Sequence, residues 1–177
     1  MRVLCLSLSL SLLLLALPSA AGGQKREPLT QAQADQIADL GGSPPDRIKL
    51  YIKFLDERAE VIKGLTNRAA SAARSRRLDD ELQMFTALID ELASNLDEYG
   101  DRKADLRSAL NPLTEATPRW LNILRALAGD SGFSVSRKEA IESGEDLDDQ
   151  AKRLLTEQTT YFSAHKDKSG QDRQEPQ

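Results

Sequence analysis

The chain has 177 residues, a formal net charge of −4 and an aromatic content of 5%. Its 24 basic and 28 acidic residues are mixed along the sequence, which argues against nucleic acid as the main partner. The few aromatic residues leave little for stacking bases or sugars. A chain of this length forms a single domain that can bury a core without disulfides or a metal.

The first 21 residues are predicted to be a cleaved signal peptide. Arg2 supplies its positive charge, residues 3–17 its apolar core, and the small residues that end at Ala21 its cleavage site. The core has about 15 residues, fewer than the ~20 of a membrane-spanning helix, so we expect no transmembrane span after cleavage. An uncleaved N-terminal anchor is the alternative. Cleavage also removes Cys5, the only cysteine. We therefore predict a secreted or periplasmic protein.

The mature chain is predicted to begin with a disordered linker at residues 22–29 and a short helix. Thr30 and Gln33 have the spacing of a capping box, and Gly41 and Gly42 end the helix that they open. The next helix starts after Ser43, with proline in its first turn. Its apolar or small residues recur at alternating spacings of four and three, which indicates one face of a helix: Ile48, Ile52, Leu55, Ala59, Ile62, Thr66, Ala69 and Ala73.

A second stripe has the same spacing but is out of step with the first: Leu78, Leu82, Phe85, Ile89, Leu92, Leu96, Tyr99, Lys103, Leu106, Leu110 and Leu113. Either the chain turns back between Ser71 and Arg77, or one helix continues with a phase slip. We favour the hairpin, because a single helix from Asp46 to Leu110 would be about 100 Å long. Lys103 is expected at the edge of the bundle with its ammonium in water.

Two helices complete the predicted domain, which spans residues 30–165. Asn111–Pro112 is expected to end the second long helix, and Thr117–Pro118 to start a shorter one with Thr117 as its cap. Ser136 and Glu139 form a second capping box for the last helix, and residues 166–177 are predicted to be a disordered polar tail. No segment alternates with period two. The sequence therefore predicts an all-α, antiparallel helical bundle of about four to five helices, two of them long.

We find no residues with the spacing of a catalytic, cofactor or metal site, and we expect none. His165 is the only histidine and lies near the end of the last helix. The acidic pairs Asp79-Asp80, Asp90-Glu91 and Asp97-Glu98 are expected on solvated faces, and the acid-rich segment 142–149 lacks the spacing of a calcium loop. Trp120 and Tyr161 are expected in the core, although lining a ligand pocket is the alternative for both.

Four arginines form the strongest candidate site: Arg68, Arg74, Arg76 and Arg77. No acid lies between the first and the last of them, and the hairpin would gather them at one end of the bundle. Guanidinium groups suit phosphate and carboxylate groups, so an anionic lipid, a polyanion or an acidic protein surface could dock there. The alternative is a basic turn that pairs with nearby acids.

By elimination, the sequence predicts an exported, non-enzymatic protein that acts as an interaction or scaffold module. Its partner would be an unidentified envelope protein or an anionic surface. A ligand-binding bundle that holds a small molecule or an anionic lipid between its helices is the alternative. An enzyme with an unrecognised carboxylate pair is a third hypothesis, which requires a buried acid in a cleft. The two long stripes close on each other within one chain or pair in a homodimer, and the sequence leaves both open.

Overall fold

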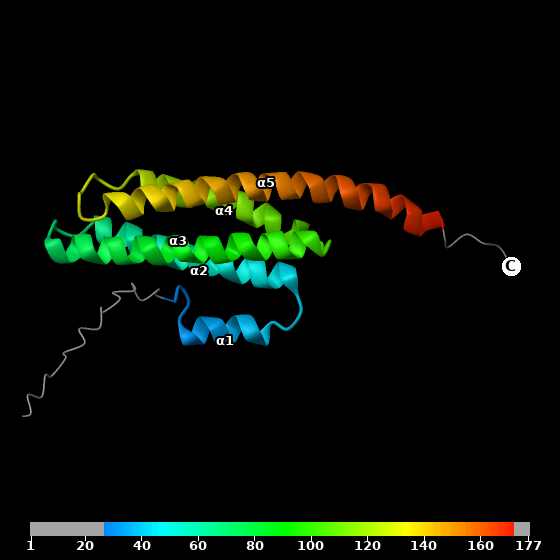
Figure 1. Cartoon of the computed structure of the whole chain (residues 1–177), viewed down its shortest axis with the longest axis horizontal. Helices are drawn as coiled ribbons and strands as arrows, with labels where there is room; N and C mark the ends of the chain where they lie inside the picture. Colours follow the sequence, from blue (N-terminus) through cyan, green and yellow to red (C-terminus); the bar gives the residue numbers. More distant parts are fainter. Residues whose placement is uncertain (1–26, 172–177) are drawn as a thin grey trace, which may run out of the picture.

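The computed structural model describes residues 27–171, with side chains as far as residue 165. This part of the chain contains five helices: α1 Gln31–Asp39, α2 Pro44–Thr66, α3 Ala72–Asp101, α4 Arg107–Arg125 and α5 Ser134–Gln171 (Figure 1). It contains no strand, which confirms the all-α class. The predicted signal peptide, most of the predicted linker and residues 172–177 lie outside the described residues.

The starts of the first two helices follow the local sequence closely. Thr30 caps α1 in a complete capping box: its hydroxyl accepts the Gln33 amide at 3.3 Å, and the Gln33 side chain accepts the Thr30 amide at 3.0 Å. Gly41 then takes a φ of +58°, a conformation that glycine adopts without a Cβ clash. Ser43 is the N-cap of α2, with its hydroxyl bonded to the Asp46 carboxylate at 2.7 Å.

The structure contains the hairpin between the two long stripes. The chain turns at residues 67–71, slightly earlier than predicted, because α3 already begins at Ala72. Ser71 is the N-cap of α3 and accepts the Arg74 amide at 3.2 Å. The Arg74 Nε group donates to the Leu65 carbonyl at 2.7 Å, which satisfies an acceptor at the end of α2. Side-chain caps therefore make this turn without glycine or proline.

The predicted extent of the second long helix was wrong. α3 ends at Asp101, and Lys103 adopts a φ of +57° in the turn that follows. The last three apolar residues of the second stripe, Leu106, Leu110 and Leu113, belong to the start of α4. Their spacing matched the stripe only by coincidence, because Lys103, with its left-handed backbone conformation, separates α3 from α4.

The predicted break at Asn111–Pro112 and restart at Thr117–Pro118 were also wrong, because α4 runs through both prolines. A proline inside a helix costs about 3 kcal/mol or more through its lost hydrogen bond and its ring clash. α4 compensates by burying a continuous apolar face that includes Leu110, Leu113 and Trp120. Thr117 is fully buried, and its hydroxyl bonds to Asp148 at 2.6 Å instead of capping a helix.

The predicted capping box at Ser136 is wrong as well, because α5 begins at Ser134. Ser136 is buried, and its hydroxyl bonds to the Asp79 carboxylate on α3 at 2.5 Å. At its other end α5 continues to Gln171. Residues 166–171, which were predicted to belong to a disordered tail, are therefore helical.

Helices α2 to α5 form the bundle, in which each packs against two others. α2 contacts α3 and α4, and α5 contacts the same two helices. The antiparallel arrangement predicted for the whole bundle holds only within the hairpins α2–α3 and α4–α5. Between the hairpins they run in the same direction: on α3 and α5, Asp79 bonds to Ser136 and Ala93 bonds to Gln150 (Figure 1). The bundle is thus two antiparallel hairpins stacked in the same sense.

The apolar stripes meet inside the bundle. Besides Trp120, the largest fully buried side chains of the core are Phe54, Phe85, Ile48, Leu55, Ile62, Leu78, Leu82, Leu88, Ile89, Leu92 and Leu96. Trp120 is 2% exposed and packs edge-on against Phe85, as expected of a core residue. Tyr161 is 39% exposed, so its predicted place in the core was wrong. None of the residues of α1 is buried, and α1 lies outside the bundle (Figure 1). No helix in the described part has an apolar stretch long enough to cross a membrane.

Candidate functional site

The structure places the four arginines of the candidate site in the α2–α3 turn and the first two turns of α3. Arg68 and Arg76 are exposed, and no ion pair joins them to another described residue. Arg74 is half-buried and holds the Leu65 carbonyl at 2.7 Å. Arg77 is exposed, with its Nε 3.3 Å from a carboxylate oxygen of Glu81. We call these four residues the arginine end. Among the residues that the structure describes, two of its side chains have partners and two do not.

The loop between α4 and α5 packs against the arginine end. The carboxylate of Asp130 accepts the Ser75 hydroxyl at 2.6 Å and the Gly132 amide at 2.8 Å. These bonds, the Ser75 bond first, hold the pKa of the Asp130 carboxyl below its usual range, and the charge of Arg74 acts in the same direction. A Cβ on Gly132 would lie 3.0 Å from the Cβ of Ser75, so the loop backbone sits directly on α3. The loop therefore places one acid near Arg74.

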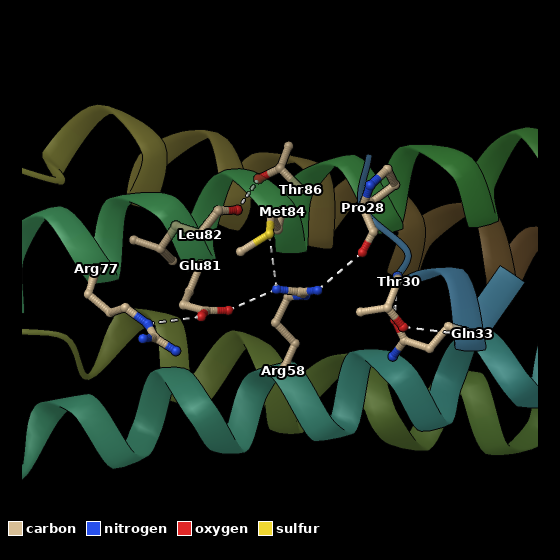
Figure 2. A network of polar contacts seen from close by, with 9 residues as sticks. All are labelled: Pro28, Thr30, Gln33, Arg58, Arg77, Glu81, Leu82, Met84 and Thr86. Atoms are coloured by element: carbon tan, nitrogen blue, oxygen red, sulfur yellow. Dashed lines mark hydrogen bonds and ion pairs between the residues drawn. The ribbon is translucent and has the colours of Figure 1, made fainter. Parts of the chain in front are cut away.

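A partly buried ion pair, which sequence reasoning missed, joins the middle of α2 to α3 (Figure 2). Arg58 Nη1 lies 2.8 Å from Glu81 Oε2, and their side chains are only 13% and 9% exposed. The other carboxylate oxygen of Glu81 is the one near Arg77. In the sequence, Arg58 directly precedes the stripe residue Ala59, and Glu81 directly precedes the stripe residue Leu82. This position could have indicated the ion pair, because a charged residue next to a core position lies at the margin of the interface between two helices.

Arg58 also holds the segment that precedes α1. Its Nη2 donates to the Pro28 carbonyl at 3.1 Å, and its Nη1 also lies 3.5 Å from the sulfur of Met84 (Figure 2). Its Nε is buried and has no hydrogen-bond partner. Since α1 buries none of its own residues, this bond and the partly buried Leu29 and Ile37 attach the segment to the bundle. We call residues 27–42 the N-terminal arm.

The opposite end of the bundle carries a small pocket between the end of α3 and α5. Its volume is about 210 Å³, and it is lined by Gly100, Lys103, Leu154, Glu157, Gln158, Tyr161 and Phe162. Lys103 is exposed, as expected, although it lies in a turn and not on a helix. Gln158 is buried and ties down this turn, because it accepts the Leu106 amide at 2.8 Å and donates to the Ala104 carbonyl at 2.9 Å.

His165, Asp90, Asp97 and Glu98 are exposed, whereas Asp79 and Asp80 are half-buried and so differ from the expectation of a solvated face. The His165 ring stacks on Tyr161, with ring centroids 4.0 Å apart. Glu91 differs from the expectation as well, because it is half-buried and accepts the Tyr51 hydroxyl at 2.6 Å. Burial, together with Glu91, raises the pKa of Tyr51 far above its usual value. In residues 27–165 no group of three or more histidine, cysteine, aspartate or glutamate side chains is placed to hold a metal ion.

Comparisons with protein-family models, curated proteins and solved structures found no match to this chain. The arginine end, the ion pair and the pocket must therefore be interpreted from their own geometry and chemistry.

Proposed function

We propose that this protein is an exported, non-enzymatic interaction module that docks through its arginine end onto an anionic surface in the cell envelope or outside the cell. The observation that carries the proposal is the state of Arg68 and Arg76. Both are exposed, and neither forms an ion pair with another described residue. Export rests on the signal-like residues 1–21.

The surroundings of Arg68 and Arg76 suit an anion. The first turn of α3 contains no acid, so the positive end of its helix dipole adds to the charge of the arginines. Arg74 is fixed on the Leu65 carbonyl, which keeps one guanidinium at a set place beside the turn. An arginine presents several donors in a planar fork that matches phosphate and carboxylate oxygens. The partner is therefore an anionic lipid surface or an acidic face of an envelope protein.

The proposal is tested by binding of the mature chain, residues 22–177, to phosphatidylglycerol vesicles, with phosphatidylcholine vesicles as the neutral control. A protein partner is tested by capture from envelope extract with the wild-type chain and with the substituted chains. A surface cation contributes about 1 kcal/mol near an anionic membrane, so Arg68→Gln with Arg76→Gln should weaken binding roughly thirtyfold. Lys53→Gln with Arg102→Gln is the matched control, because it removes two exposed cations elsewhere.

Binding should also weaken as salt is added, since exposed charges are screened. Equal binding of the arginine variant and the control variant would contradict the proposal. So would the absence of any retained lipid or protein above the neutral control.

A ligand-binding bundle is the second candidate function. The observation that favours it is the pocket of about 210 Å³ at the end of α3, which is small compared with drug-sized sites. It lies at the opposite end of the bundle from the arginine end, so the two functions are independent of each other.

A further inference from the structure

The pocket at the end of α3 combines apolar walls with one cation. Tyr161 and Phe162 pack edge to face, with centroids 5.1 Å apart, and form the wall on α5. Leu154 forms another wall, and it packs closely on α3: a Cβ on Gly100 would lie 3.3 Å from its methyl group. Lys103, whose side chain is exposed, also lines the pocket. The walls suit a flat apolar group, and the volume limits it to a small one.

Lys103 occupies a position where glycine is the usual residue. The Ala104 amide donates to the Tyr99 carbonyl at 3.0 Å, and the Lys103 amide donates to the Gly100 carbonyl at 2.9 Å. These two bonds form a Schellman motif, which puts Lys103 at its left-handed position, with a φ of +57°. A side chain with a Cβ is disfavoured in this conformation. Backbone strain of this kind clusters at sites where a side chain has a function.

The ammonium of Lys103 is the cation at the pocket that can pair with a bound anion. Its Nζ lies 5.9 Å from the centroid of the Tyr161 ring, and no ion pair joins it to another described residue. Arg107 lies over Phe162, but Asp105 holds it with bonds of 2.7 and 2.8 Å. The acid that lines the pocket, Glu157, lies 3.9 Å from Arg153, so a neighbouring cation partly offsets its charge.

We propose that this pocket binds a small aryl monocarboxylate. The carboxylate would bind the Lys103 ammonium, and the ring would lie against Leu154, Tyr161 and Phe162. A single ammonium matches one negative charge, whereas a phosphate dianion needs more donors than the pocket provides. The apolar body is needed as well, because an exposed ion pair alone contributes little. The inference rests on the ligand-binding candidate and is independent of the arginine end.

Titration of the mature chain with 3-phenylpropionate, followed by amide NMR shifts, tests the proposal. Saturable shifts are expected for residues around Lys103, Tyr161 and Phe162, with a Kd in the millimolar range for so small a ligand. The uncharged amide of the same acid should bind about tenfold more weakly, because it lacks the charge-assisted bond.

Lys103→Gly is the decisive variant, because it removes the cation and relieves the positive φ, so lost binding cannot be ascribed to unfolding. It should weaken the binding of 3-phenylpropionate about tenfold. Tyr161→Ala should weaken both the acid and the amide, since it removes a wall that is already partly exposed. Arg102→Gln is the matched control: it removes the neighbouring exposed cation, which pairs with Glu98, and should leave binding unchanged.

Three results would overturn the proposal: no saturable shift at the pocket, equal binding of the acid and its amide, or wild-type binding by Lys103→Gly. The variant with Arg68→Gln and Arg76→Gln should bind 3-phenylpropionate as the wild type does. Failure at the pocket and failure at the arginine end are therefore distinguished in one set of proteins.

Discussion

Replacing Glu81 by leucine tests whether the ion pair of Figure 2 is a coupled unit. The substitution removes the carboxylate that binds Arg58 at 2.8 Å and leaves a guanidinium that is only 13% exposed. Loss of one partner of a fully buried pair costs about 3–5 kcal/mol, because the remaining charge stays desolvated. Arg58 keeps the Pro28 carbonyl as a partner, so we expect the lower end, about 3 kcal/mol.

The double variant, Arg58→Met with Glu81→Leu, should recover most of this loss. Replacing both charges by apolar side chains of similar size is often neutral or stabilising, so its stability should lie within about 1 kcal/mol of the wild type. Urea unfolding of a chain of residues 22–177, followed by helical circular dichroism, gives the free energies if the m-value stays constant. The Pro28 carbonyl loses its donor, so amide exchange in the N-terminal arm should become faster.

Glu60→Gln provides the control, because Glu60 forms an exposed ion pair with Lys63 on α2, the helix that carries Arg58. Such pairs contribute about 0–1 kcal/mol, so stability should change little. The reasoning is refuted if the double variant loses as much stability as Glu81→Leu and Arg58→Met, each made alone, lose together. That result would mean that Arg58 and Glu81 stabilise the fold separately and that neither is left as an uncompensated charge when the other is removed.

Gln158→Leu leaves the buried Leu106 amide without its acceptor and should cost about 1–3 kcal/mol in urea unfolding; an unchanged midpoint would contradict the role of Gln158 in the turn. Lys103→Gly should raise the free energy of unfolding by about 1 kcal/mol, since glycine adopts a positive φ without a Cβ clash; a loss of stability would show that the lysine is not strained. The carboxyl of Asp130 should titrate below the usual aspartate range in an NMR pH titration. Because its pKa is lower in the folded state, it adds stability above the unfolded pKa that is lost as pH falls through the folded pKa. Ser75→Ala should move this pKa upward, and an unchanged value would show that the Ser75 bond is not the main cause.

The parts of the fold that the sequence predicted correctly depend on short-range signals. The capping box at Thr30 needs only residues three apart, and the structure confirms it. The stripe that begins at Ile48 needs only the helical period, and its apolar members as far as Ile62 are buried. The turn near Ser71 followed from the phase difference between two stripes. In each case the deciding contacts lie within one helix or one hairpin.

The features that the sequence did not predict depend on contacts between distant segments. Pro112 stays inside a helix because burial of the α4 face compensates for the lost bond. Ser136 bonds to Asp79, which is 57 residues away, and so does not act as a cap. Lys103 separates two helices with a positive φ, a conformation that the sequence usually indicates by a glycine. The ion pair of Arg58 and the pocket at Tyr161 form only when the helices have been assembled.

For the candidate site, the sequence identified the four arginines but not which of them are already engaged. That distinction needs the position of the Leu65 carbonyl, which Arg74 satisfies, and the spacing from Arg77 to Glu81 on α3. Docking at the arginine end stays a prediction, as do export and a homodimer.

The shared direction of the two hairpins has a consequence for the outer faces of the bundle. A hairpin stacked on another in the same sense, as in helical-repeat proteins, leaves outer faces that the stack itself does not cover. Such arrays need a terminal unit with a polar outer side to remain soluble. The N-terminal arm lies against the outer side of the α2–α3 hairpin, where the Pro28 carbonyl bonds to Arg58 on α2 and none of the residues of α1 is buried. It therefore adds a polar segment to one outer side of the stack without extending the buried core.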